Sequence, residues 1–254
     1  MQIIISPAKK MACRTDLLEP AGQPAFWERS KVLRDYINGL DFEEQKKLWG
    51  CNEKIAQESA ERFRAMTLGQ GGTPAVLAYE GIQYQYMAPE VLETSALAYL
   101  QEHLVILSGL YGALRPLDGV EPYRLEMQAK ARVEGSRDLY EFWGDTLYQY
   151  TRDESRTWIN LASKEYFKCI EKYLQPEDTF LTIQFGEYLE GKVVQKGVYA
   201  KMARGEMVRF LGERQVKDLE EIREFSGGGY RFAPGLSTPD KYVFLMEKSH
   251  REKG

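Results

Sequence analysis

The stretch that most constrains the fold runs from Leu104 to Asp145, where a buried strand opens into a long polar loop. Residues 104–107 form an uninterrupted apolar run, which ends at the Ser-Gly-Leu-Tyr-Gly turn of residues 108–112. The loop that follows is dense in arginines, carboxylates and aromatic residues, and ordering it costs conformational entropy. Such loops are more often functional than not, because they lie where a strand ends and a site opens. We therefore expect this segment to line a functional cleft.

Short apolar strands alternate with amphipathic helices along the rest of the chain. Further strands are predicted at 2–5, 75–79, 158–161, 179–185, 192–198, 230–232 and 242–246. Helices are predicted at 26–38, 41–48, 52–66, 89–100, 136–150, 163–170, 200–211 and 216–225. This order favours an α/β fold, with α+β as the alternative, built on a mixed sheet flanked by helices. We expect one domain over residues 1–254, with residues 26–66 as a possible helical subdomain inserted near the N-terminus.

Composition excludes several classes of protein. A chain of 254 residues that is 43% hydrophobic can bury a real core. Its net charge of −4 means that any phosphate site must come from a local cluster of lysines and arginines. Three scattered cysteines and two histidines make a Cys/His metal cage untenable, and unpaired thiols fit a reducing cytoplasm. The sequence shows neither a signal peptide nor an apolar run near the ~20 residues of a membrane span, so a cytoplasmic location is expected.

The turn at residues 49–52, between two predicted helices, is a candidate phosphate contact. It contains a glycine and is flanked by Lys46, Lys47 and Lys54. Backbone N–H groups at a helix start can face a phosphate, so the turn resembles a helix-hairpin-helix element. Asn52, which tolerates the left-handed conformation, stands in place of a second glycine. An ordinary helix–helix turn is the alternative.

Cations are the first set of candidate site residues. They lie near predicted strand ends and on the helix at 200–211, where Gly205 would let another group approach the backbone closely. Arg115 precedes a proline, which favours an extended, fixed guanidinium. Solvated surface charges are the alternative. The predicted phosphate- or DNA-binding residues are Lys9, Lys54, Arg115, Arg124, Lys201 and Arg204.

Carboxylates and polar residues form the second set. Asp118, Glu126 and Asp145 could pair with arginines, act as a general acid and base, or hold a hard cation. No signature of a serine hydrolase, P-loop, dinucleotide fold or zinc protease is present. We predict no metal site and no cofactor. The polar residues expected in the cleft are Ser6, Tyr123, Asn160, Ser163 and Tyr166.

Several motifs resemble the peroxide stress protein YaaA family nearly end to end. They are ISPAK (residues 5–9), LSGLYGALRPLDGVEPYRLEM (107–127), LYEFWGD (139–145), INLASKEYFK (159–168) and KMARGEMVRF (201–210). The resemblance implies a cytoplasmic bacterial protein that keeps free iron low and so limits peroxide damage. It also implies an unusual fold with a helix-hairpin-helix near Gly50–Lys54. A positively charged DNA-binding cleft would be formed by Lys9, Arg115, Arg124, Lys201 and Arg204. One departure is Ile82, which stands where the family pattern has an acidic residue.

Three functions remain open from the sequence. The first is a DNA-binding stress protein without catalysis. The second is an enzyme acting on a nucleotide or nucleobase, with Asp145 or Glu126 as acid or base and the cations holding phosphate. The third, ranked last, is direct iron binding by Asp118, Glu126 and Asp145, since an all-oxygen site selects poorly for iron. The expected partner is DNA or a nucleotide-like phosphate ligand, and the sequence indicates no oligomeric state.

Overall fold

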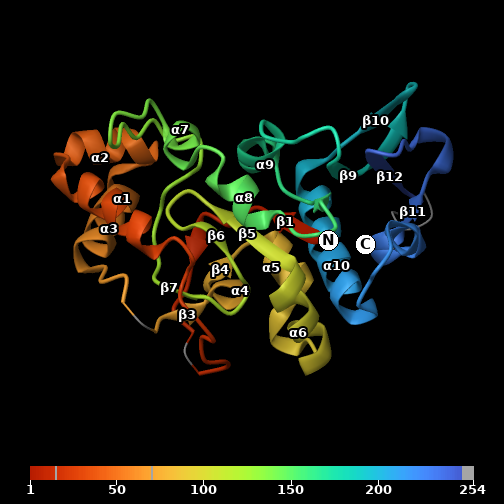
Figure 1. Cartoon of the computed structure of the whole chain (residues 1–254), viewed down its shortest axis with the longest axis horizontal. Helices are drawn as coiled ribbons and strands as arrows, with labels where there is room; N and C mark the ends of the chain where they lie inside the picture. The colour runs from red at the N-terminus through yellow and green to blue at the C-terminus, as the bar shows by residue number, and fades with distance from the viewer. Residues whose placement is uncertain (15, 70, 248–254) are drawn as a thin grey trace.

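The computed structural model describes residues 1–14, 16–69 and 71–247 and is organised around a mixed, mostly parallel sheet (Figure 1). The strand order is β11-β12-β9-β8-β1-β5-β6, and β10 pairs with β9. The parallel strands are β1 (Gln2–Ile5), β5 (Leu104–Ser108), β8 (Thr157–Asn160), β9 (Thr179–Leu189) and β12 (Lys241–Met246). The antiparallel strands are β6 (Gly112–Leu114), β10 (Lys192–Val194) and β11 (Tyr230–Phe232). The predicted α/β class is confirmed.

The centre of the sheet is built from the apolar runs that the sequence marks as buried strands. Every residue of β1 and β5 is buried, as expected for parallel strands covered on both faces. Ile3 lies opposite Leu104 on one side and Ile159 on the other, which fixes the register of β5, β1 and β8. These three strands therefore present their carboxyl ends at one edge of the sheet.

A topological switch point lies between β1 and β8. The chain leaves β1 and returns in β5 on one side, whereas it leaves β8 and returns in β9 on the other side. Neighbouring parallel strands whose connections diverge leave a crevice outside their carboxyl ends, and this crevice is where open α/β sheets bind ligands.

Helices surround the sheet, and α1, α2 and α3 gather at one end of the molecule, away from β9–β12 (Figure 1). The α-helices are α1 (Trp27–Gly39), α2 (Phe42–Trp49), α3 (Glu53–Ala65), α4 (Ala75–Ala78), α5 (Ile82–Met87), α6 (Thr94–His103), α7 (Leu139–Trp143), α8 (Thr146–Thr151), α9 (Lys164–Glu171) and α10 (Gly197–Arg214). The 3₁₀ turns are η1 (Pro89–Val91), η2 (Leu219–Glu224), η3 (Gly227–Gly229) and η4 (Pro234–Leu236). Two short pairs complete the fold: β2 (Lys10–Met11) with β4 (Tyr79–Glu80), and β3 (Thr73–Pro74) with β7 (Gly119–Val120).

Five predicted elements differ from the structure. The strand predicted at 192–198 ends at Val194, and the helix predicted at 89–100 is the turn η1 followed by α6. Residues 75–78 form α4 rather than a strand, because the N–H groups of Ala75 and Val76 bond to carbonyls of the 116–118 turn. The helix predicted at 136–150 is split into α7 and α8 at Gly144, whose φ of 55° ends the first helix. The segment predicted as a helix at 216–225 is shorter and adopts the 3₁₀ form, as η2.

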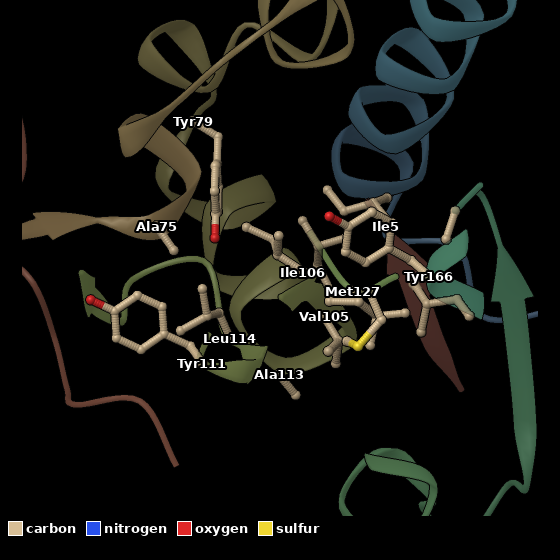
Figure 2. Packing of buried hydrophobic residues seen from close by; sticks show 14 of the residues in the cluster. Ile5, Ala75, Tyr79, Val105, Ile106, Tyr111, Ala113, Leu114, Met127 and Tyr166 are labelled. Carbon is tan, nitrogen blue, oxygen red and sulfur yellow. The ribbon is translucent and has the colours of Figure 1, made fainter. Parts of the chain in front are cut away.

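Buried apolar side chains of the sheet and of α1–α3 belong to one hydrophobic cluster, so the helices at 26–66 pack onto the same core as the sheet. Figure 2 shows side chains of β5 and β6 in this cluster together with Tyr79 and Tyr166. In the part of the chain that the structure describes, no helix is both long and apolar enough to cross a membrane.

Candidate phosphate-binding pocket

A pocket of about 450 Å³ opens at the carboxyl ends of β1 and β8, at the topological switch point. Five segments contribute to it: the loop after β1, helix α5, the loop at 123–126, the start of α9 and the middle of α10. Nine of the predicted site residues line this pocket: Ser6, Lys9, Tyr123, Arg124, Glu126, Ser163, Tyr166, Lys201 and Arg204. Residues up to 198 positions apart in the chain thus meet at one crevice, as Ser6 and Arg204 do.

Ser6 and Ser163 join the ends of the two central strands. The Ser163 N–H donates to Ser6 Oγ at 2.8 Å, and the Ser6 hydroxyl donates to Ser163 Oγ at 3.2 Å. Ser163 is the N-cap of α9 as predicted, but its hydroxyl makes no capping bond to its own helix. Asn160 shapes this turn without lining the pocket, since its side chain accepts from the Ala162 N–H and donates to Thr182. The start of α9 therefore faces the pocket.

Gly205 brings α5 against α10. A Cβ at this position would lie 2.1 Å from the carbonyl oxygen of Gln83 and 2.8 Å from the N–H nitrogen of Met87. The close approach expected at this glycine is therefore made by the backbone of α5. As a result, Gln83 of α5 and Arg204 of α10 line the same wall of the pocket.

The cations of the pocket are only partly neutralised. Lys9 pairs with Glu126 at 2.7 Å, and Arg124 stands 3.7 Å from the same carboxylate. Lys10 pairs with Glu80 at 2.7 Å. Lys201 and Arg204 form no ion pair with any residue that the structure describes. The local field in this acidic protein is therefore positive.

Three donors in the pocket wall are buried without a hydrogen-bond partner among the described residues. They are Arg124 Nε, Arg204 Nε and the side-chain nitrogen of Gln83, a residue that is only 7% exposed. Burial without a counter-charge lowers the pKa of the Arg204 guanidinium. Unmade hydrogen bonds of buried donors cost roughly 1–3 kcal/mol each, so the wall favours a ligand rich in acceptor oxygens.

Glu165 adds a carboxyl group with an altered proton affinity. Burial raises its pKa, and the nearby Glu126 carboxylate raises it further, while backbone N–H groups and Lys9 oppose the shift. Two neighbouring carboxyl groups with unequal surroundings are suited to general acid–base chemistry.

Below the pocket, buried phenols form a neutral network. The Tyr123 hydroxyl lies 2.6 Å from Ser108 Oγ and 2.9 Å from the Tyr79 hydroxyl. Burial raises the pKa of Tyr123 to about 12, so the phenol stays protonated at neutral pH. Tyr84 donates to the Ser6 carbonyl at 3.0 Å and so holds the end of β1. These residues support the floor of the pocket.

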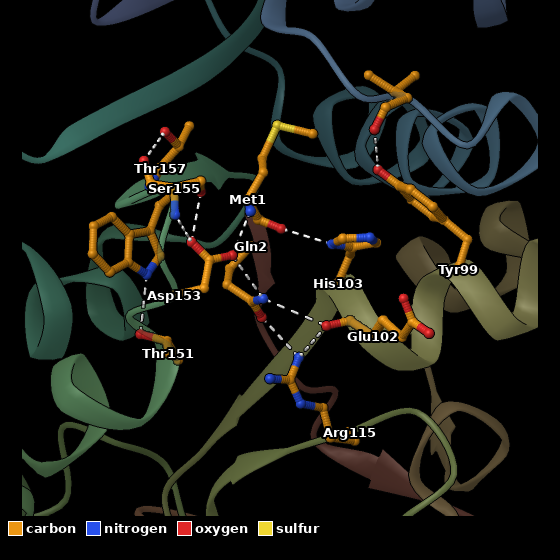
Figure 3. Close-up of polar contacts among 12 residues, drawn as sticks. Met1, Gln2, Tyr99, Glu102, His103, Arg115, Thr151, Asp153, Ser155 and Thr157 are labelled. Atoms are coloured by element: carbon orange, nitrogen blue, oxygen red, sulfur yellow. Dashed lines mark hydrogen bonds and ion pairs between the residues drawn. The ribbon is translucent and has the colours of Figure 1, made fainter.

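Arg115 does not belong to the pocket, contrary to the prediction. Figure 3 shows its guanidinium beside Gln2 and Glu102; it donates to Gln2 Oε1 at 2.7 Å and to the Glu102 carbonyl at 3.0 Å. This is the amino end of β1, at the opposite edge of the sheet. The reason is that β6 runs antiparallel to β5 and carries the chain back from Ser108 toward Leu104.

The other predicted residues outside the pocket have structural surroundings. Asp118, only 6% exposed, accepts from the Arg115 N–H at 2.8 Å and closes a tight turn. Asp145 precedes α8 and accepts from Gln149. Lys54 is exposed on α3 and lines neither the pocket nor the hollow beside it. Because Asp118 and Asp145 lie away from Glu126, the three carboxylates do not form the iron-ligand set considered above.

Two pocket residues, Gln83 and Glu165, were not predicted from the sequence. Glu165 lies within the INLASKEYFK motif, whereas Gln83 lies outside the motifs that carry the family resemblance, next to Ile82, which itself lines the pocket. Nothing in the local pattern distinguishes either residue from an ordinary surface side chain, because a single glutamine or glutamate on a short helix is common.

A second hollow, of about 750 Å³, adjoins the pocket and shares Lys9 and Glu126 with it. It reaches the turn between α2 and α3, where Gly50 adopts the left-handed conformation with a φ of 55°. Asn52 was expected to tolerate that conformation; instead it is extended and caps α3 through the Ile55 N–H. The cations that line this hollow are Lys9, Lys47, Lys130 and Arg132.

Comparison with known proteins gives a consistent result. The family described as "Peroxide stress protein YaaA" matches residues 1–236. A UPF0246 protein of Agathobacter rectalis is 52% identical over 96% of this chain and 98% of its own. UPF0246 proteins of Lachnoclostridium phytofermentans and Desulfitobacterium hafniense are 50% and 49% identical, each over 98% or more of both chains.

Proposed function

Because this chain belongs to the family of peroxide stress protein YaaA, we propose that it serves the peroxide stress response by binding DNA. The binding surface consists of the cationic pocket and the hollow beside it. In this proposal the protein is cytoplasmic, and its occupancy of DNA limits iron-dependent damage there.

The observation that carries the proposal is the continuity of the two depressions. The pocket and the second hollow meet at Lys9 and Glu126, so cations from α2, the loop after β1 and the 130–132 segment face one groove. Lys47, Lys130 and Arg132 are exposed, and Lys130 pairs with the Asp138 carboxylate at 3.5 Å. Such clusters can hold a phosphate backbone even on a protein of negative net charge.

The turn between α2 and α3 supports the same surface. Gly50 lies in the hollow and ends α2 without a side chain, so a phosphate can approach its backbone. Trp49 lines the same hollow, and its indole Nε1 is a buried donor without a partner among the described residues. A phosphate contact at this hairpin therefore falls to Lys47 and the Gly50 backbone rather than to Lys54.

The test is the salt dependence of duplex binding. Each phosphate contact contributes a slope of about −0.9 in a plot of log affinity against log salt. The double variant Lys47→Ala, Lys130→Ala should lower the magnitude of the slope by about 1.8 and leave the fold intact, because both side chains are exposed. The matched control is Lys192→Ala, Lys217→Ala, two exposed lysines outside both hollows. Equal slopes for the two double variants would refute the proposal.

A second candidate, an enzyme acting on a nucleotide or nucleobase, is supported by the raised pKa of Glu165. A carboxyl group whose pKa is raised by burial, beside the carboxylate Glu126 and in a pocket lined by cations, suits proton transfer to a held phosphate ester or base. Incubation with nucleotides, followed by chromatography, should reveal a product that Glu165→Gln abolishes. If none of the nucleotides tested is converted to a product, this candidate function is refuted.

A further inference from the structure

The charge and hydrogen-bonding capacity of the pocket specify its ligand more narrowly than a DNA backbone does. We propose that the pocket binds a phosphate monoester on a nucleoside-sized group: a free nucleoside monophosphate or the phosphorylated end of a strand. This inference rests on the proposed function only in that the pocket is part of the same surface and shares Lys9 with the outer hollow; a backbone phosphodiester could be held by the outer hollow alone.

The first argument is charge. Five cations and three carboxylates line the pocket, which leaves a surplus of two positive charges. Lys9 and Arg124 share the Glu126 carboxylate and Lys10 pairs with Glu80, whereas Lys201 and Arg204 have no ion-pair partner among the described residues, so these two are the unpaired cations of the pocket. A phosphate monoester carries about −1.5 to −2 charges at pH 7 and matches this surplus, whereas a phosphodiester carries only one.

The second argument is the set of unused donors. Gln83, Arg124 and Arg204 come from three different segments, and each has a buried side-chain nitrogen without a partner among the described residues. All three residues line the pocket. A monoester phosphate offers three terminal oxygens as strong acceptors, while a diester offers two. The wall is therefore complementary to the monoester in number as well as in charge.

The third argument is position. Ser6 and Ser163 place the pocket at the switch point, and the start of α9, an eight-residue helix, faces it. Open α/β sheets bind phosphorylated ligands at such crevices, where the N-terminus of a helix adds a partial positive charge. The partial positive charge at the helix start adds to the attraction that the unpartnered donors exert on an anion. Those donors remain the main evidence for the assignment.

The fourth argument is size and the character of the remaining wall. A volume of about 450 Å³ lies within the roughly 300–1,000 Å³ of small-molecule sites and cannot admit a duplex. Part of the lining is apolar or aromatic: Pro7, Ala8, Ile82, Tyr84, Leu125 and Tyr166. This part of the wall suits the sugar and base attached to the phosphate.

The experiment is isothermal titration of the full chain with adenosine 5′-monophosphate and with its phosphate methyl ester, a diester. We expect the monoester to bind at least tenfold more tightly than the methyl ester or adenosine. Arg204→Met should weaken the monoester at least tenfold, and Arg209→Met, on the same helix but paired with Glu213 outside the pocket, should not. Lys201→Met, at an exposed position, provides the same test should the Arg204 variant fold poorly.

Single-stranded oligonucleotides with and without a 5′-phosphate distinguish the two sources. A phosphorylated strand that binds more tightly than the free nucleotide, and more tightly than its hydroxyl counterpart, assigns the pocket to strand ends. A nucleotide that binds while both strands do not assigns it to a free metabolite. Equal affinity for monoester and methyl ester, or no binding of any monoester, overturns the inference. Salt-dependent duplex binding can persist in that case, so the proposed function and this inference fail separately.

Discussion

Asp118 is a buried carboxyl group outside the pocket, and its ionisation should weaken the fold near neutral pH. Burial raises its pKa to about 6, although the Arg115 N–H and the charge of Arg115 oppose the shift. The unfolded chain titrates near 3.8, so the native state binds more protons between about pH 4 and 6. The free energy of unfolding therefore falls as pH rises through this window, by up to about 3 kcal/mol from this residue.

The matched substitution is Asp118→Asn, whose side-chain oxygen can still accept from the Arg115 N–H. Urea unfolding at pH 4.5 and pH 7 should show a smaller loss of stability in the variant than in the parent chain. Other carboxyl groups with raised pKa, Glu165 and Glu206, contribute equally to both proteins and cancel in the difference. Parallel pH profiles would show that Asp118 does not carry this effect.

The uncharged side chain of Ile82 affects the net charge of the pocket, because an acidic residue at this position would lower it. Ile82 lines the pocket and adds no negative charge, so the positive surplus stays at two. Ile82→Asp should weaken binding of a nucleoside monophosphate about tenfold, which corresponds to roughly 1.4 kcal/mol of lost attraction. Ile82→Asn controls for the loss of apolar surface. Titration calorimetry that finds the two variants equally affected would mean that charge is not the cause.

At the scale of the element, the α5–α10 contact depends on Gly205. Gly205→Ala adds a Cβ that overlaps the Gln83 carbonyl, so α5 must move. Overpacking of this kind typically costs about 1–3 kcal/mol of stability. The higher helix propensity of alanine offsets about 1 kcal/mol of that cost. Urea unfolding should show a net loss of about 1 kcal/mol, the overpacking cost less the propensity gain. Gly212→Ala, in the same helix, meets only the flexible Leu100 side chain at 3.0 Å and should be near neutral. A Gly205 variant as stable as the Gly212 variant contradicts this reading.

The elements that the sequence predicts well are those that local chemistry decides. The buried strands at 2–5 and 104–107 are apolar apart from Gln2, and Asp41 with Glu44 forms the expected reciprocal cap of α2. The five-residue run at 75–79 is also apolar or aromatic, but so short a run suits a buried helix turn as well as a strand. Its conformation is determined by hydrogen bonds to the 116–118 turn, which lies about 40 residues away in the chain. No local sequence pattern reveals that contact.

The candidate site shows the same limit. Six of the nine predicted pocket residues follow parallel strands or lie on helices beside them, as the fold class predicts, and the other three lie in the loop at 123–126. Arg115 fails because its placement depends on the direction in which β6 pairs with β5, and Gln83 is missed because its role arises only from the contact at Gly205. Pairing direction and helix contacts are tertiary properties.

At the scale of the whole molecule, the pocket brings together cations without counter-ions and buried donors without acceptors in the described part of the chain. Lys201 and Arg204 have no counter-ions among the described residues, and three wall donors have no acceptors. The five segments that meet there are held together against this repulsion by the core beneath them. A ligand that supplies acceptors and charge should therefore stabilise the entire fold and not only the pocket rim.

A nucleoside monophosphate at 100 times its Kd should add about 2.7 kcal/mol to the free energy of unfolding. For a chain of this size, each kcal/mol raises Tm by about 2–4 °C, so Tm should rise by about 5–10 °C. Arg204→Met should reduce the rise to about half or less, because binding weakens at least tenfold, yet leave the Tm of the free protein unchanged or higher, because it removes a buried, unpaired cation. Differential scanning calorimetry measures both quantities. A large drop in the Tm of the free variant would mean that Arg204 supports the fold itself, and the pocket would then be a structural feature rather than a receptor.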